Sequence, residues 1–174
     1  MSGQPHERQE LLDAWRAVTA RRRLEGRLPL ASMQRLRDSL LQPEGDAQYV
    51  LQFDRDSLQV PYAELQIETE LPLQCQRSLQ RFLQPVRLVQ RLGLIREEAD
   101  EAGLPEGYEP LLMPPDGMLN LADLVEDELI LAVPVIAVKP GTQPMQREWH
   151  PDDSDVASQN PFAVLAALKD RPEA

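Results

Sequence analysis

A long two-residue alternation of apolar and polar side chains between residues 58 and 92 constrains the fold of this chain more than any other feature. One stretch keeps its apolar residues at odd positions: Leu65, Ile67, Leu71 and Leu73. The following stretch keeps them at even positions: Phe82, Val86, Leu88 and Leu92. Because successive side chains of a strand point to opposite faces, each stretch predicts a strand with one apolar face. The chain is therefore expected to contain a β-sheet that buries one of its sides.

A hairpin joins these two strands if Gln76 and Arg77 are its two loop residues. The predicted facing pairs are then Leu71 with Phe82, Ile67 with Val86, and Leu65 with Leu88. In this register the apolar faces of the two strands coincide, which is the condition for burying both of them in one core.

The opposite face of the predicted hairpin carries charges of both signs. One strand contributes Glu64, Glu68 and Glu70, and the other contributes Arg81, Arg87 and Arg91. Their spacing allows diagonal ion pairs, and exposed pairs of this kind contribute about 0.2–1 kcal/mol each. Two interpretations stay open: a solvated sheet face, or a patch on which the three arginines contact RNA or protein.

A change of parity before the hairpin predicts a β-bulge. An earlier strand, which includes Tyr49 and Phe53, ends at the turn-forming residues 54–57. After that turn the apolar residues lie at even positions: Leu58, Val60 and Tyr62. From Leu65 onward they lie at odd positions, and one extra residue near 61–63 would produce this change.

Helical spacing of apolar residues predicts four helices, at residues 12–25, 31–41, 120–132 and 161–169. Asp13 is the expected N-cap of the first helix and Gly26 its expected stop. Residues 139–160 are polar and rich in proline, and are expected to form a flexible loop. The expected fold class is α+β: an antiparallel β meander, which the bulge can curl toward a barrel, with flanking helices in a single domain over residues 1–174.

The helix at 120–132 carries the densest group of acids. Asn120 is its expected N-cap, Asp123 follows three residues later, and Pro134 ends it. Asp123, Glu126 and Asp127 then lie mainly on the outer side, near the positive end of the helix dipole, where they stabilise the helix. The same three carboxylates are the candidate surface for a basic partner.

A different class of protein uses such carboxylates to hold a metal ion, so a small metal-dependent hydrolase with Asp123, Glu126 and Asp127 is the alternative. A metal site of that kind usually adds histidine or further acids at ligand spacing. The sequence has two histidines, His6 and His150, and both lie in segments without regular periodicity. Binding is therefore favoured over catalysis, and no enzymatic activity is expected.

Charge is distributed unevenly along the chain. The net charge is −11, and residues 96–174 carry seventeen acids against five bases, whereas residues 1–40 carry eight arginines against five acids. This balance disfavours DNA as a partner, because phosphate binding depends on clustered Lys and Arg, and it favours a basic partner. No apolar run reaches the roughly 18 residues that a membrane span needs. With a single cysteine and no targeting segment, a cytoplasmic protein is expected.

Four segments carry a resemblance to a known family: LQCQRS at 73–78, LPEGYEPLLM at 104–113, NLADLVEDELILAVPVIAV at 120–138 and NPFAVLAALK at 160–169. In this order and at these spacings they resemble the bacterial YceD family, the large ribosomal RNA subunit accumulation proteins. The resemblance covers almost the whole chain. It implies a non-enzymatic factor, without a cofactor, for the synthesis, processing or accumulation of large-subunit (23S) ribosomal RNA. It also implies a partner in the large subunit: ribosomal RNA, a ribosomal protein or an assembly factor.

The hairpin tip departs from the family pattern. The resemblance implies a Cys-x-x-Cys motif in this hairpin, as in many members of the family, whereas this chain has Cys75 and Ser78. Four-coordinate zinc needs a full set of ligands, usually with thiolates. Because the serine removes one ligand, we expect no zinc site, and we expect backbone and strand pairing alone to hold the turn.

Overall fold

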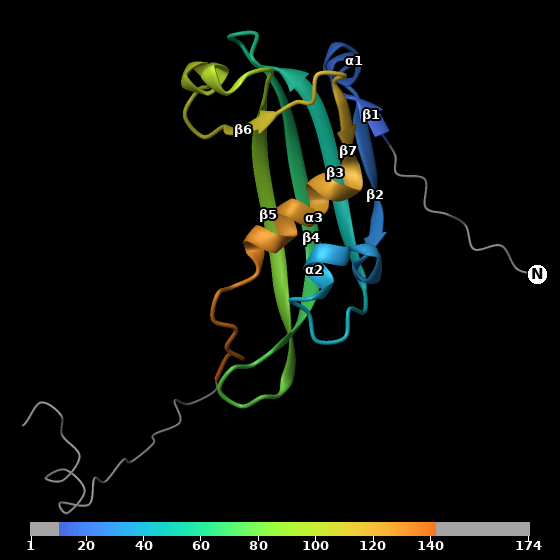
Figure 1. Cartoon of the computed structure of the whole chain (residues 1–174), viewed down its shortest axis with the longest axis vertical. Coiled ribbons are helices and arrows are strands. Elements are labelled where there is room, and N and C mark those ends of the chain that lie inside the picture. The colour runs from blue at the N-terminus through green and yellow to red at the C-terminus, as the bar shows by residue number, and fades with distance from the viewer. Residues whose placement is uncertain (1–10, 142–174) are drawn as a thin grey trace, which may run out of the picture. The chain divides into compact units, whose positions relative to one another are not determined.

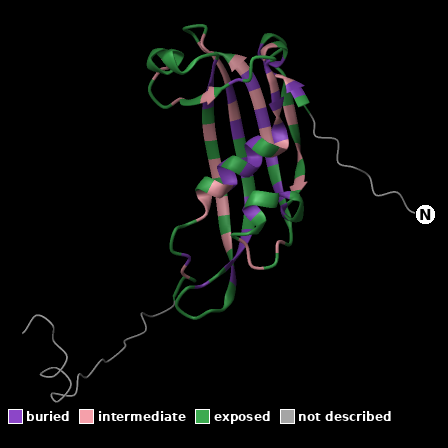
Figure 2. Ribbon diagram, in the orientation of Figure 1, coloured by how far each residue is buried: buried purple, intermediate pink, exposed green. Residues whose placement is uncertain are grey.

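Five strands form the sheet that the alternation predicts. The computed structural model describes residues 11–141, and its larger sheet has the strand order β2-β3-β4-β5-β6 (Figure 1). These strands are β2 Arg23–Pro29, β3 Asp46–Arg55, β4 Pro61–Gln74, β5 Arg81–Ile95 and β6 Glu109–Leu112. Along β3 and β4, buried residues alternate with more exposed ones (Figure 2). The predicted burial of one side of the sheet is confirmed.

The long hairpin is confirmed, but its register differs from the prediction by two residues. β4 and β5 pair antiparallel, with Ile67 facing Leu88. The loop spans residues 75–80 instead of two residues, and the Cys75 N–H closes it by donating to the Gln80 carbonyl at 2.9 Å. A shift of two residues keeps every side chain on its predicted face, since the side-chain period of a strand is two. The apolar faces of the two strands therefore still coincide.

The predicted β-bulge near residues 61–63 is wrong. β3 and β4 keep a single antiparallel register over their whole paired length. Residues 56–60 form a loop instead, in which the Asp56 carboxylate accepts the backbone N–H groups of Leu58 and Val60, both at 2.9 Å. Leu58 and Val60 of the even-numbered alternation belong to this loop, where the Leu58 side chain is 73% exposed, and Tyr62 lies in β4 on its outer face.

A layer of helices covers one face of the sheet (Figure 1). The longest, α3 Leu121–Ala132, crosses that face, and the short α2 Gln34–Arg37 packs against it. A second sheet pairs β1 Leu11–Asp13 with β7 Met118–Asn120. The core lies between these elements and the inner face of the large sheet. Its largest fully buried side chains include Phe53, Leu51, Leu65, Ile67, Leu71, Val125 and Leu129.

The helix predicted over residues 12–25 is much shorter in the structure. α1 covers Ala14–Thr19, and Asp13 is its N-cap as predicted. The Arg-rich continuation forms β2, which pairs antiparallel with β3. Gly26, the expected helix stop, lies within that strand, where a Cβ atom would come within 2.7 Å of the Tyr49 hydroxyl oxygen. Pairing with β3 therefore overrides the local helical pattern.

The helix predicted over residues 31–41 is also reduced. A 3-10 turn, Leu30–Ser32, precedes the four residues of α2. Met33 and Leu36 are buried as predicted, and Leu40 packs at the edge of the core. The chain leaves helical geometry early because it has to reverse toward β3, and Gly45 takes a positive φ of 98° in that reversal.

The sheet is open, and the barrel-like curl is not found. β2 and β6 are its two edges, and they do not pair with each other within residues 11–141. β6 runs parallel to β5, whereas a meander would make it antiparallel. The connection between them carries a 3-10 helix, Glu98–Gly103. The α+β class is confirmed, with one parallel pair in an otherwise antiparallel sheet.

Two further predictions fall on residues outside the described range. They are the flexible loop over residues 139–160, of which the structure describes 139–141, and the helix over residues 161–169. Both stay predictions, as does the single domain over residues 1–174. Within the part of the chain that is described, no helix has the length and apolar composition needed to cross a membrane.

Replacing Leu129 by alanine tests how α3 packs on the sheet. The Leu129 side chain is fully buried, so Leu129→Ala should lower the free energy of unfolding, measured by urea denaturation, by about 2–5 kcal/mol. Leu131 is 76% exposed on the same helix and gives a matched control. Leu131→Ala should change the free energy by less than about 0.5 kcal/mol. Equal losses in the two variants would contradict this orientation of α3.

Candidate functional site

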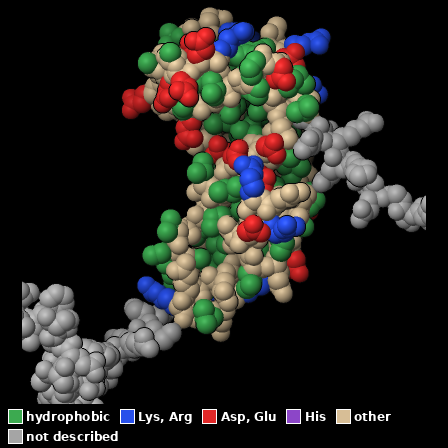
Figure 3. Space-filling view, viewed as in Figure 1, with side chains coloured by type: hydrophobic (Ala, Val, Ile, Leu, Met, Phe, Trp, Pro, Cys, Tyr) green, Lys and Arg blue, Asp and Glu red, His purple; other side chains and the backbone are tan. Residues whose placement is uncertain are grey.

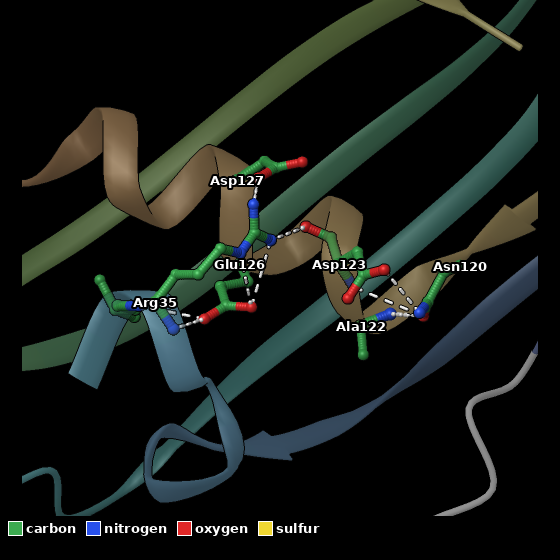
Figure 4. Close-up of polar contacts among 7 residues, drawn as sticks. Arg35, Asn120, Ala122, Asp123, Glu126 and Asp127 are labelled. Atoms are coloured by element: carbon green, nitrogen blue, oxygen red, sulfur yellow. Dashed lines mark hydrogen bonds and ion pairs between the residues drawn. The ribbon is translucent and has the colours of Figure 1, made fainter. Parts of the chain in front are cut away.

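The acidic helix α3 begins as the sequence predicts. Asn120 is its N-cap, and its Oδ1 atom accepts the backbone N–H groups of Ala122 at 3.1 Å and Asp123 at 3.4 Å. The Asn120 amide also donates to the Asp123 carboxylate at 2.7 Å (Figure 4). Asp123 is exposed. Its predicted position, on the outer side of the first turn, is confirmed.

Glu126 does not lie on the outer side of α3, and the prediction is wrong for this residue. It is 6% exposed, and its Oε1 atom accepts the backbone N–H groups of Arg35 at 2.6 Å and Leu36 at 3.0 Å in α2. Its Oε2 atom accepts from the Arg35 guanidinium at 3.2 and 3.3 Å (Figure 4). The carboxylate therefore joins α3 to a helix that is 91 residues away in the sequence. Hydrogen bonds to an ionised acceptor are the strong ones.

Asp127 is exposed, as predicted, and accepts a hydrogen bond from the Arg35 guanidinium that also binds Glu126. Arg35 Nη1 donates to Asp127 Oδ1, and this hydrogen bond is the largest cause that raises the pKa of Arg35 above its ordinary value. Glu126 raises the pKa further. Two of the three carboxylates that the hydrolase alternative needs thus already bind a cation of the protein itself. The arrangement gives that alternative no support.

Two of the candidate arginines are paired with acids on the outer face of the sheet. Arg87 Nε lies 3.0 Å from Glu68 Oε1, and Arg91 Nη2 lies 2.9 Å from Glu64 Oε2. The members of each pair face each other directly across β4 and β5, not diagonally as expected. The hydrogen bond from Arg91 lowers the pKa of Glu64. Because all four side chains are partly or largely exposed, each pair contributes little to stability.

The third arginine, Arg81, has its partner outside the hairpin. Arg81 Nη2 lies 3.5 Å from Glu44 Oε2, in the loop before β3. Arg91 adds a second kind of contact, since its guanidinium lies 5.2 Å from the ring centroid of Tyr62 and 5.6 Å from that of Tyr108. The arginines occupy the face of the sheet opposite α3. The structure therefore does not bring the acidic and basic candidates together into one site.

Glu128 is a candidate that sequence reasoning missed. Its side chain is 8% exposed, and no hydrogen-bond donor or cation within residues 11–141 pairs with it. Burial raises the pKa of Glu128, and the neighbouring carboxylates of Glu109 and Asp127 raise it further. In the sequence, Glu128 stands at a helical spacing that otherwise carries apolar side chains, and this was the available signal. Because the neighbouring charges are negative, a cation placed near this carboxyl would be attracted to it.

Glu128 belongs to a wholly acidic part of the chain. Residues 97–128 contain eleven acids and no lysine, arginine or histidine. Figure 3 shows acidic side chains over α3 and over the segment between β5 and β6. We call Glu109, Asp123, Asp127 and Glu128 the acidic ridge.

The sulfur of Cys75 also helps to hold the hairpin tip, which differs from the expectation that backbone and strand pairing act alone. Cys75 is buried, and its Sγ atom accepts the backbone N–H groups of Ser78 at 3.5 Å and Lys139 at 3.4 Å. The Ser78 side chain and these N–H groups lower the pKa of the thiol to about 6. The Lys139 contact ties the segment after α3 to the tip. Within the described residues, no group of three or more His, Cys, Asp or Glu side chains is placed to hold a metal ion.

Fold and site together define an α+β protein with an open sheet, whose acidic helix is anchored by one carboxylate and exposes others. Residues 63–169 match the family described as Large ribosomal RNA subunit accumulation protein YceD. A relative of that description from Haemophilus influenzae is 30% identical over 166 residues, which cover 87% of this chain and 91% of the relative. No solved structure matches the chain. The chain belongs to the YceD family, as the resemblance predicts.

Removing the Glu126 carboxylate tests its structural role. Glu126→Ala leaves two backbone N–H groups of α2 and the Arg35 guanidinium without their acceptor, so the free energy of unfolding should fall by about 2–4 kcal/mol. Asp127→Ala is the matched control and should cost less than about 1 kcal/mol, because that carboxylate is exposed. Urea denaturation measures both. Similar small losses would show that Glu126 is not the acceptor described.

The thiol of Cys75 gives a test by pH. Its thiolate absorbance should appear with a midpoint of about pH 6 in the folded protein and of about pH 8.5 in urea. Between these values the unfolded chain binds a proton that the folded chain has lost, so the free energy of unfolding should rise with pH. This rise should disappear in Cys75→Ala, and because the chain has one cysteine, the variant removes the whole signal. A midpoint near pH 8.5 in the folded protein would contradict the contacts to Cys75.

Proposed function

We propose that this protein is a cytoplasmic, non-enzymatic factor that supports the accumulation of large-subunit ribosomal RNA by binding. Membership of the YceD family supports the connection with this RNA. In the proposal the protein acts during assembly of the large subunit, where it holds one component of the particle. That component is a basic protein, either a ribosomal protein or an assembly factor.

One observation carries the proposed mode of action: the acidic ridge. It lies in a stretch with eleven acids and no base, and it includes Glu128, whose side chain is largely buried and has no partner among the described residues. Proteins that bind ribosomal RNA are rich in Lys and Arg, because those side chains neutralise phosphates. A surface of the opposite sign steers such proteins into contact and selects against RNA itself. The expected first contact is therefore with protein.

The outer face of the sheet is the candidate contact for RNA. Arg81, Arg87 and Arg91 are at least partly exposed, but each is paired with a glutamate. A phosphate would have to compete with that glutamate, and such a contact weakens steeply with salt. We therefore assign the main binding role to the acidic ridge and a secondary role to this face.

Removing exposed charge from the acidic ridge tests the proposal. The double variant Asp123→Asn, Asp127→Asn keeps Glu126 and its contacts with α2, so the free energy of unfolding should fall by no more than about 1–2 kcal/mol. In cells that lack the native protein, this variant should restore large-subunit ribosomal RNA less well than the unaltered chain. The ratio of large-subunit to small-subunit RNA measures the effect.

The matched control removes two exposed acids from outside the acidic ridge. Asp38→Asn, Glu70→Gln changes the net charge equally, and neither carboxylate takes part in an ion pair of the described structure. This variant should restore the RNA fully. A third variant, Arg87→Gln, Arg91→Gln, covers the other face. If it alone fails to restore the RNA, the assignment to the acidic ridge is wrong and the outer face carries the function.

A further inference from the structure

β5 leaves most of one side without a neighbouring strand. β6 covers residues 92–95 of that side. The carbonyl of Ile95 accepts the N–H of Met113 on the β6 side at 2.9 Å, whereas the carbonyl of Gln80 accepts the N–H of Cys75 on the β4 side. Because the direction of the backbone polar groups alternates along a strand, the odd-numbered residues of β5 point away from β4.

The odd-numbered residues below β6 therefore offer free backbone groups. Leu83, Arg87 and Val89 have N–H and C=O groups with no hydrogen-bond partner among residues 11–141. Pro85 has no N–H, and its carbonyl accepts from the Gln84 side chain at 3.2 Å. Proline at an edge limits unselective strand pairing. A partner strand can thus form a ladder at Arg87 and Val89, directly below β6.

The inner side of this edge is partly uncovered and apolar. Leu88 and Gln90 point toward the helix layer and are half-buried. Three apolar side chains at the end of α3 and just after it are also exposed: Leu131, Val135 and Ile136, at 76%, 94% and 65%. In Figure 1 the end of α3 lies over β5, and the Gln76 N–H at the hairpin tip donates to the Ala137 carbonyl of the segment after the helix at 2.9 Å. A strand added at the edge would bury part of this surface.

The upper end of the same edge is acidic. Leu92 and Glu109 are partners in the parallel register, so their side chains share the inner face. The negative charge of Glu109 raises the pKa of Glu128, so the two carboxyls lie near each other. In an added strand that continues β6 downward, the residue facing Gln90 would lie about 7 Å from Glu109, which is two residues along a strand. A basic side chain at that position would lie beside both acids.

We propose that the edge of β5 at residues 87–91, together with Glu109 and Glu128, is the docking site for an extended basic segment of a partner protein. The segment adds a strand in line with β6 and places a Lys or Arg on Glu128. Main-chain hydrogen bonds supply affinity in this mode of binding, and alternate side chains supply specificity. The inference deepens the proposed function and rests on it for the role of the partner.

Charge complementarity favours a basic peptide segment over a second copy of the chain or RNA at this strand edge. A second copy paired edge to edge would present only uncharged inward side chains of β5, such as Leu88 and Gln90, to Glu109 and Glu128. RNA has no amide ladder to pair with the strand, and its phosphates would meet the same acids. The opposite edge of the sheet, β2, has Leu24, Gly26 and Leu28 at its inward positions, so it offers no carboxylate to a basic side chain on the inner face. The edge of β5 is the one that suits a basic strand.

Binding of a defined peptide tests the proposal on the full chain. The probe is a peptide of about ten residues that alternates lysine and valine, a pattern suited to a strand with one basic face. We expect it to slow hydrogen exchange at the backbone amides of Arg87 and Val89, measured by NMR. The same peptide with alternate backbone nitrogens methylated keeps its charge but cannot pair, and it should give no protection.

Two pairs of variants separate charge from strand pairing. Glu128→Gln should weaken binding of the lysine–valine peptide by about tenfold or more, whereas Glu101→Gln, the same change at an exposed site outside the acidic ridge, should not. Val89→Pro removes an unused N–H from the docking edge and should abolish binding. Arg27→Pro makes the same change on the opposite edge and should leave binding intact. If Val89→Pro does not fold, the methylated peptide on the unaltered chain decides.

Three results would overturn the proposal: equal binding of the methylated peptide, protection of the same amides by a single-stranded RNA, or their protection by dimer formation at high protein concentration. The test also separates this inference from the proposed function.

If a folded Val89→Pro variant no longer binds the peptide but still restores large-subunit RNA in cells, the proposed docking edge is wrong and the proposed function stands. If the chain binds the peptide as expected but its loss leaves large-subunit RNA unchanged, the proposed function fails and the strand-accepting edge stands.

Discussion

The antiparallel pairing of β4 with β5 is the interaction on which the rest of the structure depends. Its register places Ile67 beside Leu88 on the inner face and Glu68 beside Arg87 on the outer face. The inner face is apolar and needs a layer of helices to exclude water, whereas the outer face satisfies its own charges through ion pairs. Because β5 extends well below β6, the same pairing leaves a strand edge open.

Glu126 fixes the helix layer on that inner face. Its carboxylate receives two backbone N–H groups of α2 and the Arg35 guanidinium, so a rotation of α3 would leave buried donors without an acceptor. With α3 fixed in this way, Asp123 and Asp127 face solvent and Glu128 lies near β6. A carboxylate used for stability thereby positions the carboxylates that are available to a partner.

Sequence patterns predicted the elements whose evidence is local, such as the hairpin strands and the Asn120 cap of α3. They did not predict β2, because its helical pattern is overridden by pairing with β3. The hairpin register was wrong by two residues because a two-residue shift leaves the alternation unchanged, and the wider loop at 75–80 has no two-residue turn signature. Burial of Glu126 depends on donors from a distant helix, and the role of Glu128 depends on Glu109 in a parallel strand. Neither relation leaves a periodic signal in one sequence.

Sedimentation of the protein in a cell lysate through a sucrose gradient tests most directly whether it acts by binding during large-subunit assembly. We expect the unaltered chain in the fractions that contain large-subunit precursor RNA, and not with small-subunit particles. Asp123→Asn, Asp127→Asn should shift it toward the top of the gradient, since the acidic ridge is the proposed contact. An unaltered chain that stays at the top of the gradient, even at low salt where charged contacts are strongest, would contradict a binding role in large-subunit assembly.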